Sequence, residues 1–257
     1  MGTTSRGTDG MSTTSEPARH AVVLAGGRGT RLRPFTTSLP KPLVPIGDEM
    51  PILEIVLRQL AHRGFVRITL AIGHLGTLIQ AVVGDGSQWG LEVDYATEDE
   101  PLGTMGPVAA MLERLPEHFL VLNGDVLTDL DYRDMLDRHA GSEAPLTIAT
   151  YERTVDIDFG VLRVDGDRVV GFEEKPTLSY TVSMGVYALS RATLAPFTDG
   201  RAFGFDDLVI SLLASGRYPA TFPHDGYWLD IGRPDDYDRA NADFLRLRQA
   251  LLPDIDA

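Results

Sequence analysis

The stretch Ala21–Gly47, AVVLAGGRGTRLRPFTTSLPKPLVPIG, carries the strongest structural signal in this chain. It begins with the apolar run Ala21–Ala25, which is typical of a buried strand. The run continues into a glycine-rich turn, 26–31, where the backbone can approach a ligand and direct successive N–H groups at phosphate oxygens. Three cationic side chains lie in or shortly after this turn: Arg28, Arg31 and Lys41. The stretch therefore predicts a triphosphate site.

Two common phosphate-binding motifs do not describe this turn. A Walker loop needs a Gly-Lys-Ser/Thr sequence, which does not follow, and the dinucleotide fingerprint needs a third glycine, which is missing. For the glycines taken alone, a tight turn with solvated arginines is the alternative.

The complete string is more specific. Gly-Gly-x-Gly-Thr-Arg-Leu at 26–32, then Pro34, then Pro40-Lys41-Pro42-Leu43, resembles the signature of the sugar-1-phosphate nucleotidyltransferases, or nucleotide-sugar pyrophosphorylases. The closest motif match is to bacterial mannose- and heptose-1-phosphate guanylyltransferases. The resemblance runs from about Ala21 to about Phe244.

Composition narrows the class of protein. The 257 residues suit one large α/β domain, and a hydrophobic content of 43% supports a substantial core. The absence of cysteine excludes disulfides and thiolate metal sites. No membrane-spanning run or signal-peptide pattern is found, so we expect a cytoplasmic protein without a membrane partner. The net charge of −14 argues against nucleic acid as a partner.

The pattern along the chain predicts one folded domain. Residues 1–18 are polar and are expected to form a disordered tail. The remainder, 19–257, is expected to be a single nucleotidyltransferase domain, with a nucleotide-binding half at 19–130 and a sugar-phosphate-binding half with a C-terminal helix at 131–257. Helices are expected at 51–63, 75–83, 107–115, 205–213 and 234–251. Strands are expected at 21–25, 66–72, 91–95, 119–122, 146–151 and 182–189, with a hairpin at 161–172.

This alternation predicts an α/β fold, Rossmann-like, with a mostly parallel mixed sheet and helices on both faces. Ligands of such sheets bind at the carboxyl ends of strands, where the glycine turn falls. No hexapeptide repeats follow Phe244, so the C-terminal β-helix of some relatives is not expected.

Two aspartates follow apolar segments that should end at the same edge. Asp125 comes after 119–122 and Asp230 after 227–229. Mg²⁺ prefers a few carboxylates together with substrate phosphates. For either aspartate alone, a turn or helix cap is the alternative. The resemblance implies that both bind the metal.

The resemblance also implies the roles of individual residues. Arg31 would contact the leaving β- and γ-phosphates, Lys41 the α-phosphate, and Lys175 the sugar phosphate. The catalytic residues are then Arg31, Lys41 and Asp125. The nucleotide-binding residues are Leu24, Ala25, Gly26, Gly27, Arg28, Gly29, Thr30, Glu98, Gly103 and Thr104. The sugar-phosphate-binding residues are Asn123, Gly160, Glu174, Lys175 and Gly185. A solvated turn at Glu174-Lys175 and a bulge at the strand glycines are the alternatives.

Glu98 bears on which nucleotide is used. The resemblance aligns it with a glutamine that reads the pyrimidine edge in thymidylyl and uridylyl enzymes. A carboxylate offers only acceptors, which match the two adjacent donors of guanine, so GTP is favoured. The stretch Gly84–Leu91, however, resembles thymidylyltransferases, so dTTP, UTP or CTP stays open. Met105, where relatives have a small residue, would narrow the pocket, which leaves a cyclitol phosphate open as acceptor.

The expected reaction is an in-line displacement on the nucleotide α-phosphorus by a sugar-1-phosphate oxygen, with Mg²⁺ as cofactor. The expected partners are the nucleoside triphosphate and the sugar-1-phosphate, with self-association possible. Two other functions remain as alternatives: a non-catalytic nucleotide-sugar-binding regulator, and a cytidylyltransferase for a non-sugar phosphate.

Overall fold

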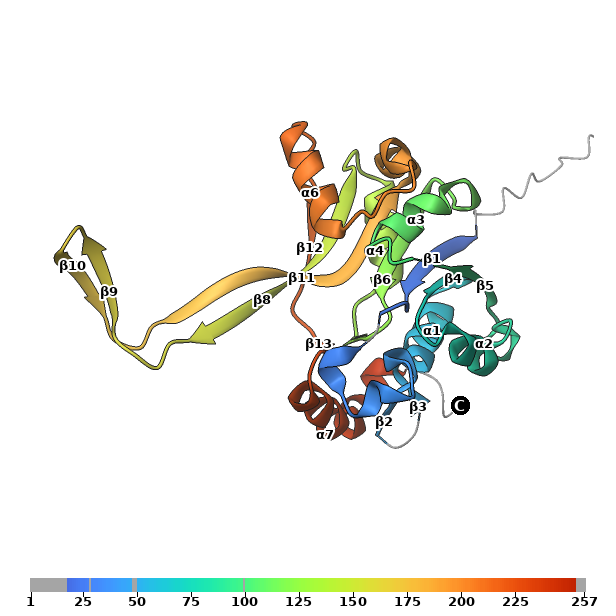
Figure 1. The fold of residues 1–257 in the computed structure, drawn as a ribbon, viewed down its shortest axis with the longest axis horizontal. Coiled ribbons are helices and arrows are strands. Elements are labelled where there is room, and N and C mark those ends of the chain that lie inside the picture. Colours follow the sequence, from blue (N-terminus) through green and yellow to red (C-terminus); the bar gives the residue numbers. More distant parts are fainter. Residues whose placement is uncertain (1–17, 28, 48–49, 99, 253–257) are drawn as a thin grey trace, which may run out of the picture.

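The computed structural model describes residues 18–27, 29–47, 50–98 and 100–252. The expected disordered tail therefore lies outside the described residues, except for Ala18. The centre of the molecule is a seven-stranded sheet with helices around it (Figure 1). No helix in the described ranges has both the length and the apolar character to cross a membrane.

The sheet is mixed and mostly parallel, as predicted. Its strand order is β12-β8-β11-β6-β1-β4-β5. β1 lies between β4 and β6 and is parallel to both, while β11 is antiparallel to β6 and β8. The strands are β1 (Arg19–Leu24), β4 (Phe65–Ile72), β5 (Glu92–Thr97), β6 (His118–Asn123), β8 (Leu146–Asp156), β11 (Thr177–Ser190) and β12 (Ala220–His224).

Helices pack on both faces of this sheet because successive side chains of β1 point to opposite faces. Ala21 and Val23 belong to one core cluster and Val22 to another. The first cluster includes side chains of α1 (Ile52–His62), α2 (Gly76–Val83) and α4 (Tyr132–Ala140). The second includes side chains of α3 (Gly106–Ala110), α5 (Arg191–Leu194) and α6 (Phe205–Ala214).

A third core cluster joins the two ends of the described chain. The last helix, α7 (Pro234–Leu251), places the fully buried Phe244 with Leu32, Ile46 and Ile52. Near this cluster lie two short ladders, β2 (Pro45–Ile46) with β3 (Met50–Pro51), and β7 (Val126–Thr128) with β13 (Trp228–Asp230). The segment that follows the glycine turn is thus packed against the C-terminal helix.

One expected helix is shorter in the structure. The prediction of a single helix over 107–115 is wrong, because α3 ends at Ala110 and a 3-10 turn covers Leu112–Arg114. Pro116 accounts for the end of that turn, since the residue before a proline is disfavoured in the helical region. Leu115 is accordingly extended, with φ −92° and ψ 148°.

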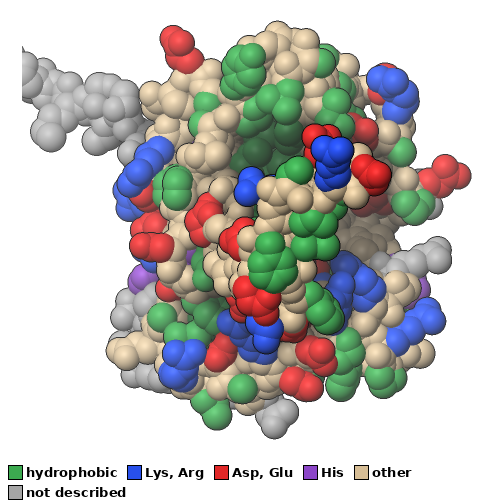
Figure 2. Space-filling view, turned by 90° about the vertical axis from the view of Figure 1, so that its left-hand side faces the viewer, with side chains coloured by type: hydrophobic (Ala, Val, Ile, Leu, Met, Phe, Trp, Pro, Cys, Tyr) green, Lys and Arg blue, Asp and Glu red, His purple; other side chains and the backbone are tan. Residues whose placement is uncertain are grey.

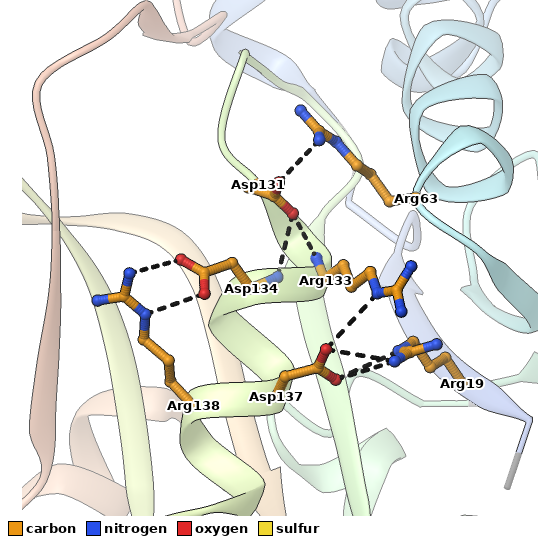
Figure 3. Close-up of polar contacts among 7 residues, drawn as sticks. All are labelled: Arg19, Arg63, Asp131, Arg133, Asp134, Asp137 and Arg138. Carbon is orange, nitrogen blue, oxygen red and sulfur yellow. Dashed lines mark hydrogen bonds and ion pairs between the residues drawn. The ribbon is translucent and has the colours of Figure 1, made fainter. Parts of the chain in front are cut away.

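Helix α4, which the sequence pattern did not reveal, is fixed by ion pairs (Figure 3). Its N-cap Asp131 accepts hydrogen bonds from the backbone N–H groups of Arg133 and Asp134, and Arg63 of the segment after α1 lies 2.7 Å from the same carboxylate. One turn further on, Asp137 pairs with Arg19 at 3.1 Å. These contacts attach α4 to the start of β1 and to the end of α1.

Strands β8 and β11 are longer than the apolar runs predicted. The last pair of β8 with β12 is Tyr151 with His224, and β11 pairs with β6 only from Val186 onward. Beyond these points β8 and β11 pair with each other and project from the body, ending in the hairpin β9 (Val161–Asp165) and β10 (Arg168–Glu173) (Figure 1). We call residues 152–181 the arm.

Candidate active site

A cavity of about 500 Å³ opens at the carboxyl ends of β1 and β6. After β5 the chain crosses back to place β6 on the other side of β1, so the sheet order reverses at this point, where ligands of open α/β sheets bind. The cavity is lined by Leu24, Ala25, Gly26, Gly27, Gly29, Thr30, Arg31, Lys41, Pro42, Ala71, Glu98, Pro101, Gly103, Thr104, Asn123, Gly124, Asp125 and Gly232. The predicted nucleotide-binding residues therefore all line one cavity, apart from Arg28, which lies outside the described residues.

The glycine turn is held against its neighbours by close backbone contacts. The Thr36 hydroxyl donates to the carbonyl of Gly29 at 2.7 Å. Gly29 has φ +58°, and a Cβ there would lie 3.0 Å from the methyl group of Thr36 and 3.1 Å from Cβ of Lys41. A side chain at this position would both strain the backbone and push Lys41 away.

Lys41 and Asp125 line the cavity, and Asp230, which does not line it, lies beside Lys41. The Lys41 ammonium is 2.5 Å from Oδ2 of Asp125 and 4.0 Å from Oδ1 of Asp230, and Lys41 itself is buried. Asp230 reaches this position because β13 pairs with β7, which places Asp230 opposite Val126, next to Asp125. Residues 84 and about 190 positions from Lys41 in sequence are thereby brought to one point.

The two carboxylates affect one another. Burial raises the pKa of Asp230, and the neighbouring charge of Asp125 raises it further, while Lys41 and Arg31 act in the opposite direction. Oδ1 of Asp125 is buried and has no hydrogen-bond partner. Asp125 thus presents one oxygen to Lys41 and leaves the other available.

This arrangement suits a divalent cation. An orphaned carboxylate oxygen beside a second carboxylate is a suitable donor pair for Mg²⁺, which usually takes one or two carboxylates and completes its shell with waters and phosphates. Within the described ranges no group of three or more acidic or histidine side chains forms a metal site. A metal here would therefore depend on substrate oxygens.

Glu98 is the other acidic side chain that lines the cavity in the described part of the chain. Its Oε2 accepts a hydrogen bond from the backbone N–H of Leu102 at 3.0 Å, and its Oε1 would lie 3.2 Å from a Cβ on Gly26. The following loop is fixed by Gly103, whose φ is +77° and whose Cβ would lie 2.7 Å from the carbonyl of Phe203. The expectation that Met105 narrows the pocket is wrong, because Met105 is fully buried in the core beside α3.

The predicted sugar-phosphate residues divide into two groups. Asn123 lines the cavity, and Gly185 is next to it, since a Cβ on Gly185 would lie 2.6 Å from Nδ2 of Asn123. Gly160, Glu174 and Lys175 lie in the arm, between the β8–β11 ladder and the hairpin of β9 and β10, and do not line the cavity. One chain in this conformation therefore does not bring the second group to the site.

Five lining residues were not singled out from the sequence: Pro42, Ala71, Pro101, Gly124 and Gly232. Ala71 lies near the carboxyl end of β4, and its carbonyl accepts a hydrogen bond from the backbone N–H of Ala25 at 2.8 Å. The rule that parallel strands end at one edge was sufficient to find Ala71. Gly124 and Gly232 each lie within two residues of a predicted metal-binding aspartate.

The fold, the glycine loop and the Lys41–aspartate cluster are together those of a nucleotide-transferring enzyme. Residues 20–246 match the model of the nucleotidyl transferase family, and the chain belongs to that family. Its predicted membership and its Rossmann-like fold are confirmed.

Individual relatives narrow the comparison. The chain is 36% identical to mannose-1-phosphate guanylyltransferase of Mycobacterium tuberculosis (strain ATCC 25618 / H37Rv) over 88% of its own length, and it spans only 64% of that relative. It is 32% identical to D-glycero-alpha-D-manno-heptose 1-phosphate guanylyltransferase of Aneurinibacillus thermoaerophilus over 86% of its length and 96% of that protein's. HddC from Yersinia pseudotuberculosis, solved in complex with GMP-PN, superposes with a TM-score of 0.67 at 29% identity and covers 88% of this chain and 99% of its own. Relatives with another base exist too, such as glucose-1-phosphate adenylyltransferase of Bacillus mycoides (strain KBAB4), 31% identical over 88% of this chain and 68% of its own.

Proposed function

We propose that this protein transfers a nucleoside monophosphate from a nucleoside triphosphate to a sugar-1-phosphate and releases pyrophosphate. The observation that carries this proposal is the convergence of Arg31, Lys41 and Asp125 around one glycine-lined cavity, with Asp230 beside Lys41. The names of the similar guanylyltransferases support it.

The reaction forms one bond and breaks one. An oxygen of the sugar-1-phosphate bonds to the α-phosphorus, and the bond from that phosphorus to the α,β-bridging oxygen breaks. The electron pair leaves with pyrophosphate. The nucleophile is already an anion near neutral pH, so the protein needs no general base, and alignment and charge neutralisation supply the catalysis.

The protein groups act on the phosphates in order along the cavity. The N–H groups of the glycine turn and the guanidinium of Arg31 would hold the β- and γ-phosphates. Lys41 would neutralise the α-phosphate, where charge develops. Lys41 is paired with Asp125 in the free protein, so a cation on Asp125 would release its ammonium toward the substrate.

Asp125 and Asp230 would hold Mg²⁺ through the orphaned Oδ1 and the neighbouring carboxylate. When bound, the ion supplies positive charge that polarises phosphoryl oxygens. The two aspartates orient it, and the partly buried setting keeps their charges close to the substrate.

GTP is the nucleotide that we propose. The Glu98 carboxylate is fixed by the Leu102 N–H and lines the cavity, where it can accept from both donors of a guanine edge. A thymine or uracil edge has one donor and one acceptor and would leave the carboxylate facing an acceptor. The sugar side would be read by Asn123 and the backbone near Gly185, with Gly160, Glu174 and Lys175 as the other predicted contacts.

A substrate matrix tests the proposal. Five nucleoside triphosphates are each combined with hexose, heptose and cyclitol 1-phosphates in the presence of Mg²⁺, and pyrophosphate release is measured. GTP with a mannose- or heptose-type phosphate is expected to give the highest rate. Higher rates with dTTP or UTP would contradict the base assignment, and no release with any pair would contradict the function itself.

A further inference from the structure

The arm is a stiff extension of the sheet. From Ser183 paired with Thr150 to Thr177 paired with Asp156, β8 and β11 form an uninterrupted antiparallel ladder. At about 3.3 Å per residue this stretch alone is about 20 Å long. Glu152 accepts hydrogen bonds across the ladder from the hydroxyls of Ser179 and Thr181, and Thr177 donates to Asp156 at 2.6 Å. The arm therefore holds its tip out from the body (Figure 1).

The tip carries an apolar face that nothing in the described chain covers. Leu162 and Val164 alternate along β9, and their partners on β10 are Phe172 and Val169. Cross-strand partners point to the same face, so the four side chains form one apolar surface. They are between 52% and 63% exposed. An exposed cluster of large apolar side chains of this kind is typical of an interaction surface. Figure 2 views the molecule from the side of the arm and shows hydrophobic side chains among acidic and basic ones.

The cavity has too few positive charges of its own to balance two phosphate-bearing substrates. The described ionisable residues that line it are two cations, Arg31 and Lys41, and two anions, Glu98 and Asp125. Lys41 is already paired. Two phosphate-bearing substrates need additional positive charge, and the arm offers Lys175 next to Glu174. Lys175 has φ +44°, a conformation that non-glycine residues rarely adopt and that is concentrated at functional sites.

The body has exposed apolar side chains on α6, the helix whose first residue contacts the cavity lining. Ile210 and Leu213, one turn apart on α6, are both exposed. The first residue of α6, Phe205, donates its backbone N–H to the hydroxyl of Thr104, which lines the cavity, at 2.8 Å. The start of α6 therefore borders the cavity, and Ile210 and Leu213 lie five and eight residues further along the helix.

We propose that the arm is exchanged between two copies of this chain, so that each active site combines the cavity of one protomer with Glu174 and Lys175 of the partner's arm. This inference rests on the proposed function. A second copy of this chain is the occupant because its exposed apolar surface on α6 can cover the tip of the arm. Its own arm can in turn bring a cation to the cavity. Since β11 is antiparallel to β6, the arm leaves the sheet at the same edge as the cavity, and a two-fold arrangement can place each arm over the other copy's cavity.

Paired variants distinguish exchange from closure of the arm over its own cavity. Asp125→Asn damages the cavity and Lys175→Ala the arm, and each variant alone is expected to lose about 100-fold in rate. The two chains, carrying different tags, are coexpressed and the mixed dimer is isolated by both tags. With exchange, one of its two sites has an intact cavity and an intact arm, so about half of the wild-type rate per dimer is expected. If the arm acts on its own cavity, the mixed dimer stays inactive.

The matched control reverses this outcome. A mixed dimer of the wild-type chain with a chain that carries both substitutions is expected to be inactive when arms are exchanged, because each site then contains one damaged part. It keeps half of the wild-type rate if each arm serves its own chain, which would overturn the proposal. Circular dichroism of each variant confirms that it is folded.

A second measurement does not depend on activity. Sedimentation of the wild-type chain is expected to give twice the mass of one chain, and Leu162→Lys on the arm is expected to give single chains. Leu245→Lys, at an exposed leucine on α7, is the matched control and should remain dimeric. A monomeric wild-type chain, or a dimer unaffected by Leu162→Lys, would overturn the exchange. If the dimer behaves as expected while no substrate pair releases pyrophosphate, the proposed function fails and the docking of the arm stands.

Discussion

The ammonium of Lys41 lies 2.5 Å from one carboxylate oxygen of Asp125, and the other oxygen of that carboxylate is buried without a partner. One oxygen of the Asp125 carboxylate therefore pairs with the Lys41 ammonium, and the other oxygen has no partner. We expect a divalent ion and the α-phosphate to bind side by side here only when the Asp125 carboxylate is negatively charged.

Asp125→Asn should accordingly remove most of the activity. The amide keeps the shape of the side chain but loses the negative charge that a cation requires, and we expect the rate to fall about 10²- to 10³-fold. The measurement is pyrophosphate release across a Mg²⁺ titration. Asp137→Asn, at a carboxylate on α4 that is about half exposed and paired with Arg19, should stay near the wild-type rate. Equal rates for Asp125→Asn and the wild type would rule out the assignment of Asp125.

Glu98→Gln should change the choice of base. An amide has one donor and one acceptor, so it loses the match to guanine and gains one to uracil or thymine. We expect kcat/KM for GTP to fall about 10- to 100-fold relative to UTP and dTTP, which corresponds to about 1–3 kcal/mol. The control is Glu92→Gln on β5, where the carboxylate pairs with Arg67 at 3.1 Å. An unchanged ratio of GTP to UTP in Glu98→Gln would show that Glu98 does not read the base.

Two glycines with nearly the same φ allow the cost of backbone strain to be measured separately from the cost of steric crowding. Gly64 and Gly103 have φ +79° and +77°, but a Cβ on Gly64 meets nothing within 4 Å, whereas one on Gly103 lies 2.7 Å from the Phe203 carbonyl. Gly64→Ala should cost about 1 kcal/mol of unfolding free energy through backbone strain alone. Gly103→Ala should cost more than about 2 kcal/mol and also weaken nucleotide binding. Urea denaturation and nucleotide titration measure the two effects, and equal costs at the two positions would refute the role of the Phe203 contact.

Stability should fall in mild acid because of His139. Burial, together with the charge of His118, lowers the pKa of His139 from 6.5 to about 4. Its ring is within 2.9 Å of the Thr147 hydroxyl and 3.2 Å of the Ser190 hydroxyl. Between these pKa values the unfolded chain binds a proton that the folded chain does not, so the unfolding free energy decreases as the pH falls. The full effect of this one group is about 3 kcal/mol.

Urea denaturation at pH 7, 6 and 5 measures this dependence. His139→Gln keeps a neutral polar group and should show a shallower decrease between pH 7 and 5. His74→Gln, at an exposed histidine, should follow the wild type. A decrease in His139→Gln as steep as in the wild type would mean that other groups cause it.

The central sheet and the glycine loop could be predicted because their signals are local. Ala21–Ala25 is apolar on both faces, as a strand with helices packed over both faces of its sheet is expected to be, and the glycines follow it directly. Helix α4 was missed although Tyr132, Met135, Leu136 and His139 are buried at helical spacing, because polar residues surround them. Its N-cap, Asp131, was the signal that could have located it.

The arm could not be predicted from periodicity. Its strands continue through Glu152–Asp156, where both faces are exposed and cross-strand hydrogen bonds replace burial. The motif around Glu174 and Lys175 can be recognised in the sequence, but the direction in which the hairpin projects cannot. That direction depends on the bulge between Ser183 and Tyr187. The position of Asp230 opposite Val126, next to Asp125, is likewise a product of the ladder between β7 and β13 and has no local signature.

The position of β1 in the sheet also determines in which order the parts of the site come together during synthesis. The glycine loop leaves the ribosome about 200 residues before Asp230, and β1 must wait for β6, some 100 residues later, to be paired on both sides. At a translation rate of about 5–20 residues per second the glycine loop of the nascent chain is without Asp230 for about 10 seconds or more. Only when β13 and α7 have emerged are the acidic pair and the cover over Leu32 in place. A nascent chain thus lacks the acidic pair beside Lys41 until β13 and α7 have been made.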